Sequence, residues 1–158
     1  MRFANRYRIE SARLPSWDYH ACGLYFLTFG TRDRAPLLGT LTEEGVRPSR
    51  LGRLTRDAFR LAQSRHPGVT VEACVVMPDH VHALIELGAG CRCRLGNVVG
   101  RVKQHVTCAE SSAPRPLWQE RFYDQIIRDE RHREAVRAYI RDNPARAWAR
   151  RIFHPPPP

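Results

Sequence analysis

Two apolar runs separated only by Pro78 and Asp79 constrain the fold of this chain more than any other feature. Residues 69–77 and 80–87 read VTVEACVVM and HVHALIEL, and both are rich in β-branched and large apolar side chains. A proline followed by an aspartate favours a turn, and so short a turn between two strands closes an antiparallel hairpin. The sequence therefore predicts an antiparallel sheet that contains this hairpin.

The segments before the hairpin have the patterns of a strand and then of a helix. Residues 24–31, LYFLTFGT, have the aromatic and apolar character of a buried strand. From Ser49, a suitable N-cap, apolar side chains recur at helical spacing until Pro67 and Gly68. One strand and one helix are therefore expected ahead of the hairpin.

After the hairpin, the patterns predict a helix, a strand and a last helix. Residues 95–106 carry an apolar stripe of helical period, and residues 117–130 are expected to form a fourth strand followed by a turn. The last helix is expected in residues 130–143. Pro144 disfavours helical geometry at the residue before it, so this helix is expected to end at Asn143.

The order strand, helix, strand, strand, helix, strand and final helix predicts the fold class. It fits an α+β, ferredoxin-like (split βαβ) fold, which is an antiparallel sheet with helices on one face. The extra C-terminal helix would carry Tyr139. A chain of 158 residues suits a single domain, here 1–158 with a core of about 13–148, a short N-terminal lead and a proline-rich tail.

Two features of the sequence bear on the compartment. The first residues lack the apolar segment of a signal peptide, and no apolar run is long enough to cross a bilayer. Five cysteines without a C-x-x-C pair make a disulfide framework unexpected, and Cys91 and Cys93 are interpreted as incidental loop residues. We therefore expect a cytoplasmic, DNA-associated protein with no membrane contact.

The charge of the chain points to a polyanionic partner. It has 26 basic and 16 acidic residues, a formal charge of +10, which favours nucleic acid or an anionic membrane. The clustering of arginines between residues 121 and 151 favours nucleic acid. A GC-rich genome is the alternative explanation, because Lys103 is the only lysine and every other basic residue is an arginine.

His80 and His82 open the second strand of the predicted hairpin. Alternate residues of a strand face the same side, so the two imidazoles should lie side by side, with Cα atoms about 6–7 Å apart. That separation allows both rings to bind one cation. The alternative is a pair of surface histidines on a solvated sheet face. A metal site also needs a third ligand from elsewhere.

Three segments together resemble the REP-associated tyrosine transposases, which belong to the HUH superfamily of single-tyrosine transposases. The segments are YFLTFGTRDR, VVMPDHVHALI, and WQERFYDQIIRDE followed by YIRDNP. The resemblance implies a transposase-like enzyme that cleaves and rejoins single-stranded DNA, typically at palindromic hairpin elements. It also implies that His80 and His82 bind a divalent metal, that Asn143 completes the metal site, and that Tyr139 is the nucleophile.

The implied residues suit this chemistry. A metal that neutralises and orients a phosphodiester eases its cleavage, and two imidazoles with an amide oxygen would accept Mg²⁺ or Mn²⁺ in the presence of phosphate. Attack by Tyr139 would leave the 5′ phosphate on the phenol, so the strand could be rejoined without ATP. A core tyrosine is the alternative for Tyr139, and Tyr123 is a competing nucleophile.

Five basic side chains are candidates for DNA contacts, with a solvated helix face as the alternative for the arginines. They are Arg121, Arg128, Arg137, Arg141 and Lys103. The expected partner is single-stranded or hairpin DNA, and a monomer and a homodimer are both compatible with the sequence. A second class of function also fits, a basic single-strand nucleic-acid-binding module without chemistry. A zinc-dependent hydrolase of small molecules would leave Tyr139 and the arginines unexplained.

Overall fold

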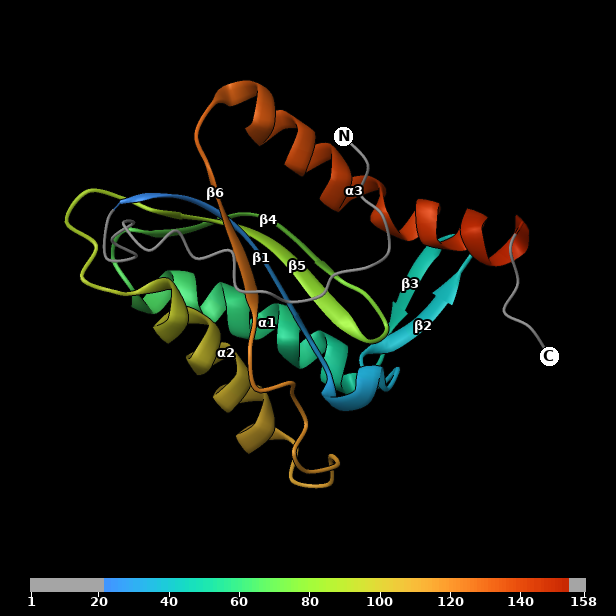
Figure 1. Ribbon diagram of the computed structural model, residues 1–158. Coiled ribbons are helices and arrows are strands. Elements are labelled where there is room, and N and C mark those ends of the chain that lie inside the picture. The colour runs from blue at the N-terminus through green and yellow to red at the C-terminus, as the bar shows by residue number, and fades with distance from the viewer. Residues whose placement is uncertain (1–21, 154–158) are drawn as a thin grey trace.

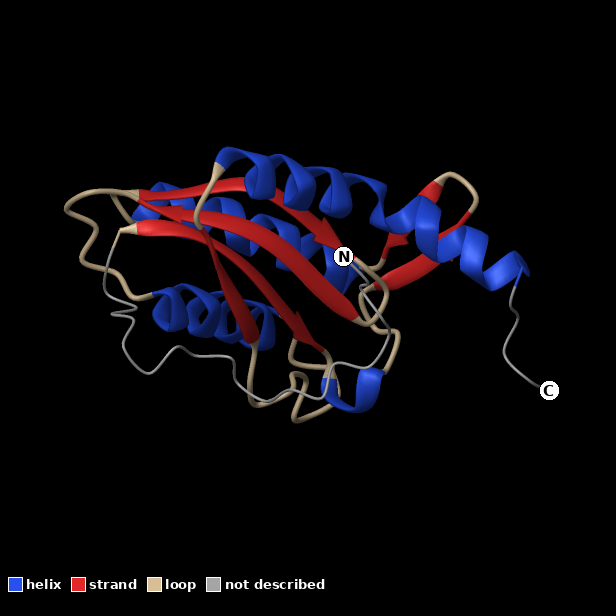
Figure 2. Cartoon of the chain, turned by 45° about the horizontal axis from the view of Figure 1, so that its top comes forward, coloured by secondary structure: helices blue, strands red, loops and turns tan. Residues whose placement is uncertain are grey.

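A four-stranded antiparallel sheet with helices on both faces forms the centre of the molecule. The computed structural model describes residues 22–153, so the expectations for the N-terminal lead and the proline-rich tail lie outside the described residues. Figure 2 shows the sheet between a long C-terminal helix and a pair of shorter helices. No helix of the described part of the chain combines the length and apolar character needed to cross a membrane.

The sheet has the strand order that a split βαβ fold requires. Its strands are β1 (Gly23–Gly30), β4 (Val69–Val76), β5 (His80–Leu87) and β6 (Tyr123–Ile127). They are arranged in the order β4-β5-β1-β6, and all neighbouring strands are antiparallel (Figure 1). The expected hairpin of β4 and β5 and the expected α+β, ferredoxin-like class are therefore confirmed.

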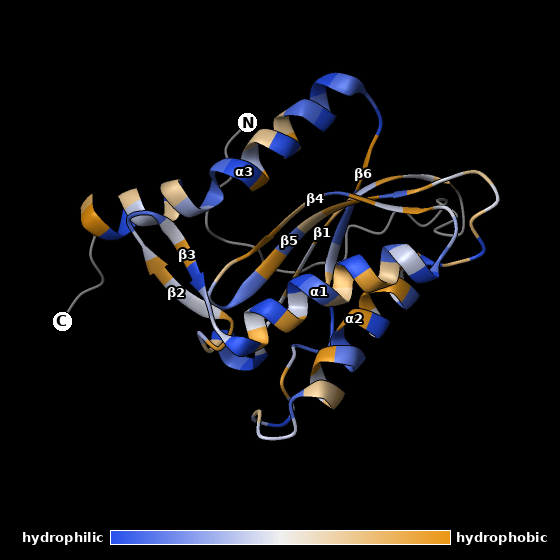
Figure 3. Ribbon diagram, turned by 180° about the vertical axis from the view of Figure 1, so that it is seen from behind, coloured by the Kyte–Doolittle hydropathy of each residue, from blue (hydrophilic) through white to orange (hydrophobic). Residues whose placement is uncertain are grey.

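Helices α1 (Arg50–Arg65) and α2 (Leu95–Ala109) cover one face of this sheet. Helix α1 begins where expected, because the Ser49 hydroxyl accepts a hydrogen bond from the Gly52 N–H at 3.1 Å and so caps the first turn. Hydrophilic and hydrophobic residues alternate along α1 (Figure 3). Its apolar side packs on the inward side chains of β1, which bury apolar area in one continuous core.

Helix α3 (Glu130–Phe153) lies on the opposite face. Val136 and Ile140 pack there against Phe26 and Leu84 of the sheet. These four buried side chains form the smaller of the two apolar clusters, together with Ile127. The second cluster fixes α3 above β5, the strand that carries both histidines.

The expected end of the last helix at Asn143 is wrong. Pro144 is inside α3, which continues to Phe153. A proline within a helix removes one hydrogen bond and crowds the carbonyl four residues earlier, at a cost of about 3 kcal/mol, but it can bend a helix without ending it. The helix bends near its middle, and its second half lies beside a small hairpin (Figure 1), which it contacts.

That hairpin, β2 (Gly39–Thr42) and β3 (Gly45–Pro48), was not predicted. Each strand has four residues, and glycine or proline occupies an end of each, so neither shows the run of β-formers that indicates a strand. Between β1 and β2, the 3₁₀ turn η1 (Arg32–Arg34) contains two left-handed residues, with φ of 55° at Asp33 and 57° at Arg34. Such angles are uncommon for residues other than glycine, and Arg34 in this turn pairs with Asp79 at 2.9 Å.

Candidate active site

The two histidines at the start of β5 face α3. Their Nε2 atoms are 3.1 Å apart, and their ring centroids are 4.7 Å apart. This is the side-by-side arrangement that the spacing predicts. Both rings therefore direct the same nitrogen into the same space.

Each of these rings is held from behind through its other nitrogen. The Asp79 carboxylate lies 2.5 Å from Nδ1 of His80, and the Thr28 hydroxyl lies 2.7 Å from Nδ1 of His82. Arg34 in turn donates from Nε to the second oxygen of Asp79 at 2.9 Å. Hydrogen bonds to Nδ1 orient a histidine and leave Nε2 to act as a ligand.

The pKa values of this group follow from burial and from its charges. Burial tends to raise the pKa of Asp79, but the hydrogen bond and charge of His80 and the charge of Arg34 outweigh it and lower this pKa below its ordinary value. Burial, with smaller contributions from the charges of His80 and Arg34, lowers the pKa of His82 to about 3. His82 is therefore neutral near pH 7 and keeps a nitrogen lone pair.

Tyr139 reaches this pair from the helix. Its hydroxyl lies 3.5 Å from Nε2 of His82. Its ring stands edge-on to the rings of His82 and Phe26, with centroids 5.2 and 5.9 Å away, an arrangement that aromatic rings favour. The phenol thus points at the histidines, although α3 and β5 are far apart in the sequence.

All four residues that the resemblance singled out line one cavity of about 630 Å³: His80, His82, Tyr139 and Asn143. Asn143 is only 4% exposed. The volume lies within the range of small-ligand sites. Tyr123, the competing tyrosine, lines the same cavity from β6.

The remaining wall of the cavity combines cations, aromatic rings and an amide. These side chains include Arg34, Arg121, Arg150, Phe122 and Gln119. Guanidinium groups suit phosphates, and aromatic rings stack on bases. The cavity therefore combines groups that can bind phosphates with rings that can stack on planar groups.

Of the five basic residues predicted to contact DNA, Arg121 alone lines the cavity. The Lys103 ammonium instead donates to the Gln119 carbonyl oxygen at 2.7 Å, and burial lowers its pKa to about 8. Arg137 is paired with Glu72 of β4, and Arg141 is paired with Asp142 at 2.8 Å. Arg128 is an exposed residue just after β6.

Three side chains of the site were not predicted from the sequence. Arg150 reaches the cavity because α3 continues beyond Pro144. Thr28 reaches His82 because these two residues are partners across β1 and β5, which only the register shows. Asp79 could have been found, since it directly precedes His80 and was interpreted only as a turn residue.

The donor set fits a divalent cation. Among residues 22–153, no three His, Cys, Asp or Glu side chains are grouped as a metal site, and the expected set has two histidines and an amide. The 3.1 Å between the two Nε2 atoms is close to the roughly 3 Å between adjacent ligands about 2.1 Å from an octahedral ion. The two Nε2 atoms are therefore suited to hold such an ion, and Asn143, the third expected ligand, lines the same cavity.

A solved structure with the same fold supports the architecture described above. No family model matches the chain. An uncharacterized protein of Haemophilus influenzae is 26% identical over 157 residues, covering 85% of this chain and 87% of that protein. The solved structure of a REP-associated tyrosine transposase bound to a REP hairpin has a TM-score of 0.67 and 24% identity, covering 83% of this chain and 72% of that one.

Proposed function

We propose that this protein, which shares the fold of a solved REP-associated tyrosine transposase, is a metal-dependent enzyme of the same kind. It would cleave and rejoin single-stranded DNA through a 5′-phosphotyrosine on Tyr139. The observation that carries the proposal is the position of the Tyr139 hydroxyl, 3.5 Å from Nε2 of His82. A tyrosine that only packs α3 on the sheet has no need to aim its hydroxyl at a histidine pair.

His80 and His82 would hold Mg²⁺ or Mn²⁺, with Asn143 as the third protein ligand. Such an ion, when bound, neutralises and orients the phosphate that is to be cleaved. The two histidines can do this because Asp79 and Thr28 occupy their Nδ1 atoms and leave both Nε2 atoms facing the cavity. Because its pKa is low, His82 carries no extra proton near pH 7, and its ring remains able to bind a cation.

Tyr139 would act as the nucleophile. Its phenolic oxygen forms a bond to phosphorus while the bond from phosphorus to the 3′ oxygen breaks, and the phenolic proton is lost as the 3′ oxygen gains one. The 5′ phosphate then remains on Tyr139. A 3′ hydroxyl can reverse the step and release the tyrosine, because the number of phosphate ester bonds is unchanged.

The proposed partner is single-stranded DNA, in particular a hairpin with an unpaired flank. Arg34, Arg121 and Arg150 would contact phosphates, and Phe122 and Tyr123 would stack on unpaired bases. The neighbouring transposase structure holds a REP hairpin, which supports a hairpin ligand here. Duplex DNA alone would present no free bases to the aromatic side chains.

The decisive experiment is a test for the covalent intermediate. Wild-type protein, incubated with Mn²⁺ and a hairpin oligonucleotide labelled downstream of the cut, should give an adduct that resists denaturant. Tyr139→Phe should bind the DNA and give none, because it removes only the phenolic oxygen. Tyr123→Phe is the control and should retain the adduct. Tight binding without an adduct in wild type would identify a binding module instead of an enzyme.

A further inference from the structure

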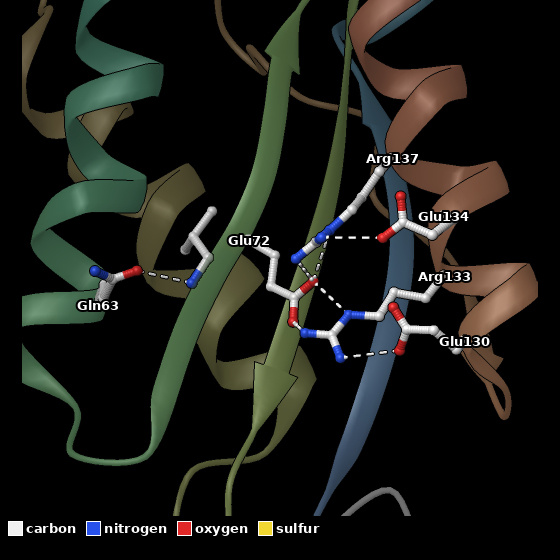
Figure 4. A network of polar contacts seen from close by, with 7 residues as sticks. Gln63, Glu72, Glu130, Arg133, Glu134 and Arg137 are labelled. Atoms are coloured by element: carbon white, nitrogen blue, oxygen red, sulfur yellow. Dashed lines mark hydrogen bonds and ion pairs between the residues drawn. The ribbon is translucent and has the colours of Figure 1, made fainter.

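A buried glutamate, Glu72, lies on β4 at the edge of the sheet. Its side chain is only 5% exposed. The pairing of β4 with β5 shifts register between Val71 and Ala73, so Glu72 is the extra residue of a β-bulge. A bulge changes the direction of a side chain, and here Glu72 extends from β4 towards α3 (Figure 4).

Two arginines of α3, one helical turn apart, hold this carboxylate. Nε of Arg133 donates to one oxygen of Glu72 at 3.0 Å, and its Nη2 donates to the other. Arg137 donates from Nε and Nη2 at 3.3 and 3.1 Å. Charge-assisted bidentate pairs fix direction as well as distance.

On the β4 side, the contact between Glu72 and α3 is itself held from the other face of the sheet. Oε1 of Gln63, on α1, accepts a hydrogen bond from the Val71 N–H at 2.7 Å (Figure 4). Edge strands have N–H groups without a partner strand, and here the N–H of Val71 has Gln63 as its partner. The bulge is therefore held between α1 and α3, and Glu72 cannot follow α3 if the helix turns.

The apolar contacts of α3 do not fix its rotation to the same degree. Val136 and Ile140 pack on Phe26 and Leu84 and keep that face of α3 on the sheet, but apolar burial is non-directional and sets the rotation less closely than hydrogen bonds do. A tyrosine hydroxyl lies about 8 Å from its helix axis, so a rotation of roughly 30° would move it by about 4 Å. A displacement of about 1 Å can already cost about 100-fold in rate.

We infer that Glu72 is a positioning residue, which sets the rotation of α3 through Arg133 and Arg137 and thereby places the Tyr139 hydroxyl beside His82. For its effect on the reaction, this inference rests on the proposed function. It also assigns Arg137 to the contact between helix and sheet in place of DNA.

The test compares Glu72→Gln with Glu134→Gln. Glu134 pairs with the same Arg137 at 3.1 Å, but from within α3, so its loss cannot release the helix from the sheet. In Glu72→Gln, the rate of adduct formation at saturating oligonucleotide should fall at least 10-fold, while the DNA concentration for half-maximal rate changes less than twofold. Glu134→Gln should match wild type. An unchanged rate per folded molecule in Glu72→Gln would overturn the inference.

A second measurement does not depend on activity. In selectively labelled protein, NMR should detect contacts between the Tyr139 ring and the rings of Phe26 and His82, whose centroids are 5.9 and 5.2 Å away. These contacts should weaken in Glu72→Gln and persist in Glu134→Gln. Their persistence in Glu72→Gln overturns the inference, whereas a missing adduct in wild type counts only against the proposed function.

If Glu72→Gln does not fold, Arg137→Gln takes its place, because Arg133 still holds Glu72 in that variant. It should lower the rate of adduct formation at least threefold and leave the affinity for DNA unchanged. A loss of affinity equal to that of Arg121→Gln, with no loss of rate at saturation, would assign Arg137 to DNA and overturn the inference.

Discussion

Thr28 and His82 are direct partners across β1 and β5, and the Thr28 hydroxyl lies 2.7 Å from Nδ1 of His82. On the other side of Thr28, its partner in β6 is Tyr123. The histidine that Tyr139 approaches is thus oriented by a residue of the neighbouring strand. Thr28 occupies Nδ1 of His82, as Asp79 occupies Nδ1 of His80, so Nε2 of each histidine faces the cavity.

The first prediction concerns this hydroxyl. Thr28→Val keeps the shape of the side chain but leaves Nδ1 of the buried His82 without its partner, which should cost about 1–3 kcal/mol of unfolding free energy. Metal affinity should fall about 10- to 100-fold, since the ring loses its orientation. Calorimetric titration with Mn²⁺ measures the affinity. Thr70→Val, at an exposed position of β4, should change neither quantity.

The sheet and most of its helices could be predicted from the sequence because each has a strong local signal. The β4–β5 hairpin has a turn pair between two β-rich runs, and α1 has Ser49 at its start. The second half of α3 could not be predicted in this way, because Pro144 is a local signal against a helix, and packing against β2 and β3 outweighs it. Tertiary contacts of this kind cannot be inferred from the few residues on either side in the sequence.

The residues of the candidate site also fall into two groups, those that a local motif predicts and those that only the fold brings together. His80, His82, Tyr139 and Asn143 are named by motifs, and the structure places all four around one cavity. Thr28 and Arg34 depend on strand register and on a turn with two left-handed residues, for which the sequence has no pattern. Arg137 has the pattern of a DNA contact but lies against Glu72, because the bulge in β4 turns that carboxylate towards it.

A second prediction concerns pH and Lys103, the only lysine of the chain. Its pKa is lowered by burial from 10.5 to about 8. Between these values the unfolded chain binds more protons than the folded chain, so the unfolding free energy should rise with pH. We expect a rise of about 1–2 kcal/mol relative to Lys103→Met, reduced from the full linkage because the ammonium is partly exposed. Urea unfolding at pH 8 and pH 10.5 measures it, and parallel behaviour of the two proteins would contradict it.

A third prediction concerns the affinity for DNA. Arg121→Gln should weaken binding of a single-stranded hairpin and make the slope of log K against log salt less steep by about 0.7, the value for one phosphate contact on a single strand. Fluorescence anisotropy between roughly 50 and 300 mM salt, over which the Debye length shortens by more than about twofold, measures both. Arg60→Gln is the control, because Arg60 lies on α1 and pairs with Asp57. Equal slopes for wild type and Arg121→Gln would remove Arg121 from the interface.

The last prediction separates the role of the histidines in cleavage from their role in the fold. His80→Ala and His82→Ala should abolish adduct formation, because each removes one of two nitrogens that face the cavity 3.1 Å apart. DNA binding should persist within about threefold, since the arginines proposed to contact phosphates are unchanged. His82 is buried, and His82→Leu, which fills more of the space and has no ligand atom, guards against loss of folding. EDTA should stop the wild-type reaction, and added Mn²⁺ should restore it in wild type but in none of the variants. A wild-type adduct that forms at the same rate in EDTA would show that the two imidazoles act without a metal, and Tyr139 would then have to react by another route.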